Sequence, residues 1–499
     1  MNAIHPIQQS ASYTSTSDVQ PARLHPVCVA SGDGIGPEVM AAALKVLDAA
    51  RAPLDITELP LGTRAWQQGI TSGISPVSWK TLNRDRVLLK GPMSTPQGGG
   101  MKSLNVTLRK SLGLFANVRP VRAYTPYIPS HHPGMDVVII RENEEDLYAG
   151  IEHRQTEDVV QCLKLVSRQG CERVIRYAFE YVRTRGRRRL TCMTKDNIMK
   201  LTDGLFHEVF DCIAEEYPDV ESDHQIIDIG TARAATSPEE FDVIVTPNLY
   251  GDVLSDVMAE VSGSVGMAPS ANIGSEAAVF EAIHGTAPDI AGKDIANPSG
   301  LILASAKMLA HLGEGETAEL IHNAWLRTIE DGVHTADIRQ TIAHSRCVGT
   351  DEFAGAVIGR LGETPRRLEP NHYPRSPILI PAVKPAQPVE KKLVGVDVFV
   401  QSRLTPDALA EQLRKAVGEM PPLTMITNRG VQVWPDGQAQ TLCTDHWRCR
   451  FKGFANSQLT AGSIIDILLK LSSNGIEFVK TENLYDFDGQ PGYSMGQGQ

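Results

Sequence analysis

The sequence has no apolar run long enough to cross a membrane and no cysteine pair spaced for a zinc site. Its hydrophobic stretches are broken by charges or glycine before they reach the roughly 20 residues that a membrane-spanning helix needs. The eight cysteines are scattered over 499 residues without a CxxC pair, which is typical of reduced, mostly buried thiols. We therefore expect no membrane partner and no structural zinc cluster of cysteines.

Basic residues are also in the minority. The chain has 48 Lys and Arg against 59 Asp and Glu, so its formal net charge is −11. Nucleic-acid-binding domains usually present a broad basic surface, so we expect no nucleic-acid partner. Residues 1–25 are rich in Ser, Thr, Gln and Pro and lack the apolar core of a signal peptide. We expect them to form a disordered tail on a cytoplasmic protein.

Short apolar runs followed by helical patterns recur along the chain. The first run, residues 27–30, leads into the glycine turn GDGIGPE and then a helical pattern over residues 39–50. Further strands are expected at residues 137–140, 190–193, 226–229 and 243–246. Alternation of strands and helices predicts an α/β fold, and the length predicts two or three domains.

The last quarter of the chain has a different pattern. Residues 371–392 are proline-rich and end in charges, which is typical of a linker. Beyond them the apolar pattern predicts a strand, a helix, two strands, a helix and a strand, at residues 393–401, 406–417, 423–434, 446–453, 461–473 and 476–482. This βαββαβ order over residues 393–499 predicts a ferredoxin-like or ACT-like α+β domain.

Two aspartates in the segment NLYGDVLSD are candidates for a metal site. Asp252 and Asp256 are four residues apart, so they would share one face of a helix. Mg²⁺ and Mn²⁺ prefer such oxygen ligands. Most aspartate pairs at this spacing are simply solvated, so the assignment depends on the neighbouring segments.

Three arginines in largely apolar surroundings support that assignment. Arg109, Arg119 and Arg141 precede the aspartates in the chain, and Ser103 and Asn105 lie just before the first of them. Arginine forks bind carboxylates in bidentate fashion. The combination predicts a small substrate with several carboxylates.

The glycine-rich turns do not indicate a Rossmann fold. GDGIGPE follows the first expected strand but gives G-x-G-x-G with Pro37 next, so the dinucleotide fingerprint G-x-G-x-x-G is not met. A second turn, HGTAPDIAGK, contains Asp289, whose carboxylate could accept hydrogen bonds from a ribose diol. Alone, this turn would be an ordinary loop.

Together these segments resemble the β-decarboxylating dehydrogenases, the family of isocitrate, isopropylmalate, homoisocitrate and tartrate dehydrogenases. The resemblance covers about residues 27–361 and is carried by long motifs: GDGIGPE, KGPMSTP, GGGMKSLNVTLRK, RENEEDLYAGIEH, TKDNIMK, NLYGDVLSD, APSANIG, FEAIHGTAPDIAGKDIANP and GTDEF. Residues beyond 370 resemble the extra C-terminal domain of long bacterial members, for which tetramer assembly and effector sensing are both open, with assembly favoured.

The resemblance implies a non-Rossmann α/β fold and an active site shared across a homodimer or tetramer. The large domain would comprise residues 26–114 and 263–370, and the small domain, with its dimer clasp, residues 115–262. Arg109, Arg119 and Arg141 would clamp the substrate carboxylates, with Asn197 also binding substrate. Asp252 and Asp256 would hold Mg²⁺ or Mn²⁺, joined by Asp228 of the partner subunit.

The resemblance also implies the acid–base groups. Lys195 and Asp228 would remove the hydroxyl proton of the substrate, and Tyr148 would protonate the carbon that loses carbon dioxide. In isolation Tyr148 would be interpreted as a packed aromatic, Lys195 as a surface lysine and Asn197 as a helix cap. Their occurrence together and in order favours the catalytic interpretation.

Substrate and cofactor depend on a few positions. Ser103 and Asn105 can hydrogen-bond the extra carboxylate of isocitrate, whereas an isopropyl group would leave both unpaired. Members that use NADP carry Lys-Tyr where this chain has Asp289 and Ile290, so we expect NAD. The remaining cofactor-binding residues expected from the resemblance are Thr95, Glu281, His284, Gly285 and Asn297.

Two alternatives remain open at this stage. Homoisocitrate or isopropylmalate could be the substrate, because one methylene changes binding by only about 1–3 kcal/mol. The chain could also be a non-catalytic regulatory subunit of the same fold. Such subunits lose catalytic or metal-binding residues, whereas Tyr148, Lys195, Asp228, Asp252 and Asp256 are all present here.

Overall fold

The computed structural model describes residues 24–95, 103–339, 345–374, 378–379, 382, 388–419, 421–454 and 459–496. Most of the expected tail (residues 1–25) and much of the expected linker (residues 371–392) lie outside them. Among these residues, no helix combines the length and apolar character that crossing a membrane requires.

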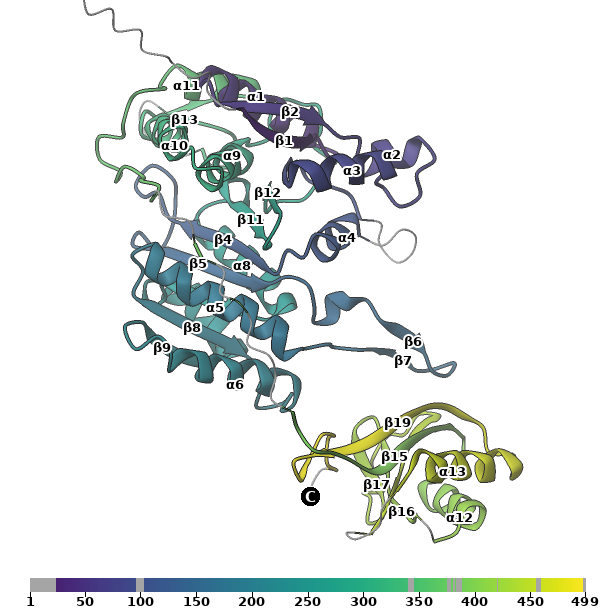
Figure 1. Cartoon of the computed structure of the whole chain (residues 1–499). Helices are drawn as coiled ribbons and strands as arrows, with labels where there is room; N and C mark the ends of the chain where they lie inside the picture. Colours follow the sequence, from purple (N-terminus) through teal and green to yellow (C-terminus); the bar gives the residue numbers. More distant parts are fainter. Residues whose placement is uncertain are drawn as a thin grey trace, which may run out of the picture.

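A ten-stranded mixed sheet runs through the N-terminal three quarters of the described chain (Figure 1). Its outer strands on both sides pair in parallel, and its centre is antiparallel at β12, β11, β4 and β5. In spatial order the strands are β2 (Leu54–Glu58), β1 (His25–Ala30), β3 (Val87–Lys90), β12 (Ala278–Ala282), β11 (Pro269–Ile273), β4 (Ala116–Arg122), β5 (Asp136–Glu142), β10 (Val243–Thr246), β8 (Arg189–Thr194) and β9 (Glu221–Ile226).

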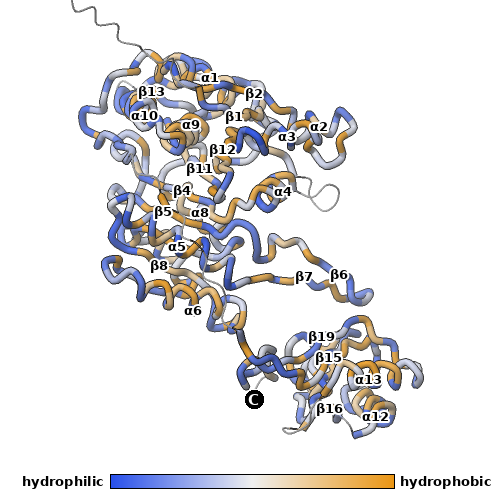
Figure 2. The backbone as a smooth tube through the Cα atoms, viewed as in Figure 1, coloured by the Kyte–Doolittle hydropathy of each residue, from blue (hydrophilic) through white to orange (hydrophobic). Residues whose placement is uncertain are grey.

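Helices pack against both halves of this sheet. The half that contains β1, β3, β11 and β12 also holds α1 (Gly36–Ala49), α2 (Thr63–Gln67), α3 (Pro76–Asp85), α4 (Leu104–Ser111), α9 (Ser299–His311), α10 (Gly315–Glu330) and α11 (Thr350–Ile358). Those in the other half are α5 (Arg168–Thr184), α6 (Thr202–Ala214), α7 (Ile227–Thr236) and α8 (Asn248–Ser262). Hydrophobic residues concentrate in the central strands and in α9 (Figure 2), whose side chains are almost all buried.

The GDGIGPE turn packs closely against the backbone of two other segments of the chain. Gly32 and Gly34 have φ of 77° and 60°, and a Cβ atom on either would lie within 2.2 Å of the carbonyl oxygen of Pro92 or of Thr286. Only glycine fits at such close backbone approaches. The turn therefore holds the segments around Pro92 and Thr286 together.

One expected strand is wrong. The sequence predicted a strand at residues 226–229, but β9 ends at Ile226 and α7 begins at Ile227. A short apolar run does not distinguish strand from helix, and the Ala- and Thr-containing segment that follows continues as a helix. Asp228 therefore lies in the first turn of α7 instead of on a strand.

The C-terminal domain forms a separate antiparallel sheet covered by two helices (Figure 1). Its strand order is β17-β16-β18-β15-β19-β20, and Leu409, Leu413, Ile467 and Leu471 on the helices pack against Val398 and its neighbours. The elements are β15 (Lys391–Gln401), α12 (Pro406–Val417), β16 (Leu423–Asn428), β17 (Val431–Trp434), β18 (His446–Lys452), α13 (Ala461–Ser473), β19 (Phe478–Phe487) and β20 (Gln490–Pro491).

This arrangement confirms the fold class expected for the chain. The order β19-β15-β18-β16 is that of a ferredoxin-like βαββαβ unit. The segment expected as one strand over residues 423–434 is a hairpin of β16 and β17, because Arg429 and Gly430, both with positive φ, turn the chain.

A two-stranded hairpin projects from the sheet toward the C-terminal domain (Figure 1). It consists of β6 (Glu152–Arg154) and β7 (Val160–Cys162). Thr156 at its turn donates a 2.6 Å hydrogen bond to Asp445, and Lys480 donates one of 3.2 Å to Gln161. The hairpin and the C-terminal domain are therefore in direct contact within one chain.

Candidate active site

A cavity of about 450 Å³ lies where the two halves of the large sheet meet. Its walls come from the segment after β3, from α4, β4 and α8, from the short turn at Leu147–Ala149, and from β11 and β12. Many of the residues singled out in the sequence line it: Thr95, Ser103, Asn105, Arg109, Arg119, Tyr148, Asp252, Asp256, Glu281, His284 and Gly285.

The carboxylates of α8 lie in this cavity one helical turn apart, as their spacing predicted. Arg141 anchors the helix from β5: its guanidinium donates to Asn248 Oδ1 at 2.7 and 3.0 Å and also to Asp252. Gly251 permits this approach, because a Cβ atom there would lie 2.6 Å from the Cβ of Arg141. The glycine in NLYGDVLSD therefore lets helix and strand close on the arginine.

Asp252 is shared by several partners. Tyr148 donates its hydroxyl hydrogen bond to Asp252, and Arg119 Nη1 lies 3.3 Å from Asp252 Oδ1 and 3.6 Å from Asp256 Oδ1. The side chain of Arg141 stacks over the Tyr148 ring at 4.8 Å. Two arginines, the tyrosine and the two carboxylates therefore form one hydrogen-bonded and ion-paired group.

Burial and charge act in opposite directions on these groups. Burial would raise the pKa of Asp252, yet Arg141 and Arg119 hold it below its usual value. Burial raises the pKa of Asp256, with Arg119 opposing. Burial lowers the pKa of Arg141 to about 9. A further positive charge next to Asp256 is therefore favoured, and carboxylate oxygens are the donors that Mg²⁺ or Mn²⁺ prefers.

Glu281 is the buried counter-ion of the opposite wall. It is paired with Lys90 at the end of β3, and its other oxygen lies 3.3 Å from Arg109 Nη2 and accepts a 2.8 Å hydrogen bond from Asn272. Burial would raise the pKa of this carboxyl, but Lys90 and Arg109 hold it far below its usual range. Glu281 also lines the cavity, and its expected role in binding the cofactor stays a prediction.

Two polar atoms of the cavity lining are buried without a partner. Asn105 Oδ1 and His284 Nε2 each lack a hydrogen bond among the described residues, although buried polar atoms usually have one. Thr95 and Ser103 stand beside them, joined hydroxyl to hydroxyl at 3.1 Å. These atoms are suited to binding a polar ligand.

Lys195 and Asp228 do not line this cavity. Lys195 Nζ donates a 2.8 Å hydrogen bond to Asp228 Oδ1, and this bond lowers the pKa of Asp228. The Asp228 side chain is 68% exposed, in the first turn of α7. Asn197 is also exposed, on the segment between β8 and α6. These three expected site residues therefore gather on a different surface of the same chain.

Three expected cofactor residues also lie outside the cavity lining. Asp289 is exposed on the turn after His284, and Ile290 packs against the main hydrophobic core. Asn297 donates a 2.9 Å hydrogen bond to Asp337, which also accepts one from Ser264. The segment around Asp337 is therefore beside Asn297.

Several site residues were missed in the sequence. Lys90, Ser270, Asn272 and Asp337 were not singled out, although the first three line the pockets around Glu281. Lys90 offered a signal, because a lysine ending a fully apolar strand has to find a buried partner. Asn272 and Ser270 offered none, since their role depends on pairing between distant strands.

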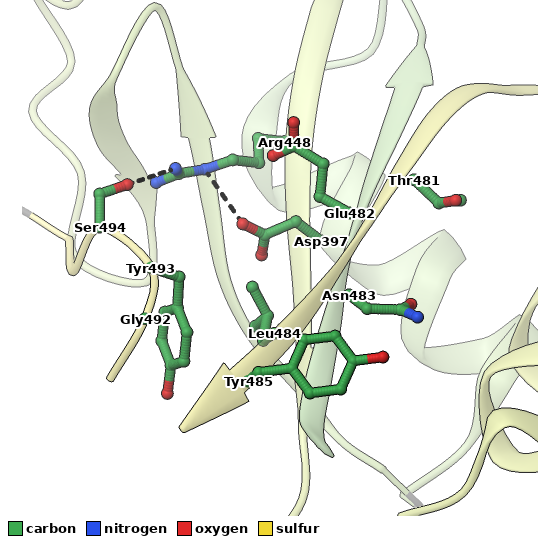
Figure 3. Close-up of a pocket in the computed structure, with 10 residues that line it drawn as sticks. All are labelled: Asp397, Arg448, Thr481, Glu482, Asn483, Leu484, Tyr485, Gly492, Tyr493 and Ser494. Carbon is green, nitrogen blue, oxygen red and sulfur yellow. Dashed lines mark hydrogen bonds and ion pairs between the residues drawn. The ribbon is translucent and has the colours of Figure 1, made fainter. Parts of the chain in front are cut away.

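The C-terminal domain has its own hollow, of about 540 Å³ (Figure 3). It lies over β15, β18 and β19 beneath the end of the described chain. Its charges are already satisfied: Asp397 forms two 2.8 Å hydrogen bonds with Arg450, and Arg448 donates to Thr427 and Ser494 at 2.9 and 3.1 Å. Nothing in this pairing specifies an occupant.

Comparison with known proteins identifies the family to which this fold and this cavity of arginines and carboxylates belong. Residues 26–357 match the model of the isocitrate/isopropylmalate dehydrogenase family, and the chain belongs to this family. Residues 391–499 match the C-terminal domain of bacterial isocitrate dehydrogenases. The resemblance seen in the sequence is thereby confirmed, including the long bacterial form.

Similar proteins contain both the dehydrogenase region and the C-terminal domain. An isocitrate dehydrogenase (NADP) of Rickettsia felis is 50% identical over 96% of this chain and 100% of its own. One of Thermus thermophilus is 44% identical over 95% of this chain and 96% of its own. The crystal structure of the TT0538 protein from Thermus thermophilus matches with a TM-score of 0.89 and 44% identity, covering 95% of this chain and 96% of that one.

The cofactor given for these relatives contradicts one prediction from the sequence. Asp289 and Ile290 predicted NAD as the preferred cofactor, but the relatives that match nearly the full chain are NADP enzymes, so the NAD prediction is wrong. The physical reason lies in the position of Asp289. An exposed carboxylate is solvated and screened by salt, so it does not exclude a phosphate by itself.

Proposed function

We propose that this protein is an NADP-dependent isocitrate dehydrogenase. It would convert isocitrate and NADP⁺ to 2-oxoglutarate, carbon dioxide and NADPH. The observation that carries the proposal is that Arg109 and Arg119 line one cavity together with Asp252 and Asp256, and that Arg119 is paired with both carboxylates. Guanidinium groups suit the carboxylates of the substrate.

The cavity residues divide the chemistry between them. Asp252 and Asp256 would hold Mg²⁺ or Mn²⁺, which supplies positive charge where the substrate oxygen becomes negative. Arg109, Arg119 and Arg141 orient the substrate. Burial raises the pKa of Tyr148, so its hydroxyl keeps a proton that it can deliver to the carbon vacated by carbon dioxide.

The proton of the substrate hydroxyl would go to the Lys195–Asp228 pair of a second copy. The pair lies outside its own chain's cavity, and the neighbouring side chains Ile198, Leu201, Ile229 and Val253 are apolar but exposed. A second copy of the chain would cover them. We infer a homodimer in which each copy completes the other's site.

The unpartnered amide oxygen of Asn105 favours isocitrate over isopropylmalate as the substrate. The amide oxygen of Asn105 and the hydroxyl of Ser103 face the cavity. The Ser103 hydroxyl can donate to a third carboxylate, and a water bound to that carboxylate can donate to Asn105 Oδ1. An isopropyl group leaves Asn105 Oδ1 unpaired, at a cost of about 1–3 kcal/mol.

NADP is supported by the full-length relatives and by two cations near the expected cofactor positions. Lys293 is exposed on the same turn as Asp289. Arg339 is exposed two residues after Asp337, which bonds Asn297. Lysine and arginine side chains are long enough to pair with a 2′-phosphate, and charge-assisted bonds of that kind contribute about 1.5–3 kcal/mol.

For the C-terminal domain we propose a role in assembly. Its contacts are with the β6–β7 hairpin, through Asp445 and Lys480. The family resemblance makes this hairpin part of the dimer clasp. A domain that packs on the clasp would order it and support association of subunits.

Steady-state rates test the proposed function. Reduced cofactor is measured with isocitrate, homoisocitrate or isopropylmalate, with NADP or NAD, and with Mg²⁺ or a chelator. The highest kcat/KM is expected for isocitrate with NADP, and the chelator should abolish it. A preference for another acid would contradict the substrate assignment. A pure homo-oligomer with no activity on any of the three acids would identify a regulatory subunit.

A further inference from the structure

Two histidines and an aspartate meet outside the active-site cavity. Asp196 follows β8, His207 lies on α6 and His224 lies on β9. One ligand atom from each of the three side chains lies within 4.8 Å of the other two. The imidazole rings stack with centroids 3.6 Å apart, and His207 Nδ1 is 2.7 Å from Asp196 Oδ2. Three elements of the fold therefore converge on one point.

Nearby polar groups hold the two rings in place. Asp211, one turn along α6, has a carboxylate oxygen 3.5 Å from His207 Nε2, and Thr194 Oγ1 is 2.8 Å from His224 Nε2. A carboxylate at the far nitrogen of a histidine fixes the tautomer and strengthens the other nitrogen as a ligand. Burial, followed by the adjacent His207 ring, lowers the pKa of His224, which leaves a lone pair available at neutral pH.

We propose that Asp196, His207 and His224 form a second metal site that takes Zn²⁺. Two imidazoles and one carboxylate suit this borderline cation, with water in the fourth position, whereas Mg²⁺ prefers oxygen donors alone. Tetrahedral zinc places its ligand atoms about 3.4 Å apart. Because the two rings are stacked at 18° and an imidazole coordinates through its in-plane lone pair, one ring has to turn out of the stack for both nitrogens to face the same ion.

Two of the three residues lie on the same segments as the Lys195–Asp228 pair. Asp196 directly follows Lys195, and His224 precedes Asp228 by four residues. An ion bound to Asp196 and His224 joins the two segments that present this pair. Zinc at this site positions the pair and stabilises the surrounding structure without touching substrate.

Metal binding to the full-length protein without substrate tests the proposal. The chelator-treated, tag-free protein is equilibrated with Zn²⁺ in excess Mg²⁺, and bound zinc is counted by elemental analysis. Co²⁺ in place of Zn²⁺ gives a visible ligand-field spectrum that reports four-coordination. We expect one retained Zn²⁺ per subunit, a tetrahedral Co²⁺ spectrum, and a higher Tm with Zn²⁺ than without it.

Matched variants identify the ligands. His207→Gln/His224→Gln should lose the zinc, the Co²⁺ spectrum and the Tm shift. Asp252→Asn, which alters only the cavity carboxylates, and Cys212→Ser, which removes an exposed thiol from α6, should keep all three. Asp196→Asn, which keeps the side-chain shape, should weaken zinc binding by about tenfold or more.

Other outcomes would overturn the site. Wild-type protein that retains less than one zinc per subunit, or zinc that persists in the double-histidine variant, contradicts the proposal. So does zinc that disappears in Cys212→Ser. If the double variant does not fold, unchanged zinc affinity in Asp196→Asn has the same meaning. Because binding is measured without substrate, failure here leaves the proposed dehydrogenase activity untouched.

Discussion

Arg109 Nη2 lies 3.3 Å from Glu281 Oε1, and Lys90 occupies the other oxygen of the same carboxylate. One buried anion thus holds two cations, and only Arg109 of the two is expected to bind substrate. Lys90 is 2% exposed and Glu281 10%. The orientation of Arg109 therefore depends on Glu281, a residue for which no contact with substrate is proposed.

Replacing Glu281 with Gln should therefore destabilise the protein and raise KM for isocitrate. The change leaves Lys90 buried without its counter-charge, which costs about 3–5 kcal/mol in comparable buried pairs. Urea unfolding measures the loss. Lys45→Met, which breaks the exposed Lys45–Asp351 pair, is the control and should cost no more than about 1 kcal/mol. Equal losses in the two variants would contradict the role given to Glu281.

Replacing Tyr148 with Phe tests the proton donor. The ring would still stack beneath Arg141, so isocitrate binding should be kept. Loss of the hydroxyl should lower kcat by about 10²–10⁴-fold, the range for a removed general acid. Tyr181→Phe, on α5, should leave kcat unchanged. A raised KM with normal kcat would show that Tyr148 binds substrate and donates no proton.

Mixed oligomers test the shared site. Lys195→Met and Asp252→Asn should each be inactive as pure variants. Coexpression of the two places an intact cavity opposite an intact Lys195 in one site of each hybrid dimer. Random pairing then restores roughly a quarter of wild-type activity for a two-fold dimer. A mixture as inactive as its parents would show that Lys195 serves the cavity of its own chain.

Glu142 makes stability depend on pH. Its carboxylate is buried and accepts hydrogen bonds from the backbone of Glu144 and Glu145, yet burial raises its pKa to about 7. The folded state therefore holds the proton of Glu142 more tightly than the unfolded state does. Protonation of Glu142 stabilises the folded state fully below about pH 4.5, and this contribution to the free energy of unfolding is lost as the pH rises through 7.

The variant Glu142→Gln isolates that effect. Because Gln does not titrate, its unfolding free energy minus that of the wild type should increase by about 2–3 kcal/mol between pH 5 and pH 8. Chemical denaturation of both proteins at each pH gives the difference. A difference that stays constant with pH would show that Glu142 ionises normally in the folded protein.

The shared helical face of Asp252 and Asp256 and the strand positions of Arg119 and Arg141 could be predicted from the sequence because their signals are local. Asp252 and Asp256 share a helical face by spacing alone, and Arg119 and Arg141 are charged residues in apolar strands. The position of Asp228 was harder to predict, because the short run of isoleucines around it fits a strand or a helix equally well until β9 and α7 are seen.

What could not be predicted depends on contacts between distant segments. The pairing of Glu281 with Lys90 and Asn272 could not be predicted, because these partners reach it only through neighbouring strands. The cofactor prediction failed for a related reason. Selectivity is a difference in free energy over the whole binding surface, and Asp289 is a single exposed charge on it.

One of the shorter ladders of the large sheet joins β11 to β4. Only residues 271–273 of β11 pair with residues 116–118 of β4, yet this ladder links the wall that holds Glu281 to the wall that holds Arg141. Because this ladder lies between the two walls, a change in the angle between β11 and β4 would alter the distance between Glu281 on β12 and Arg141 on β5.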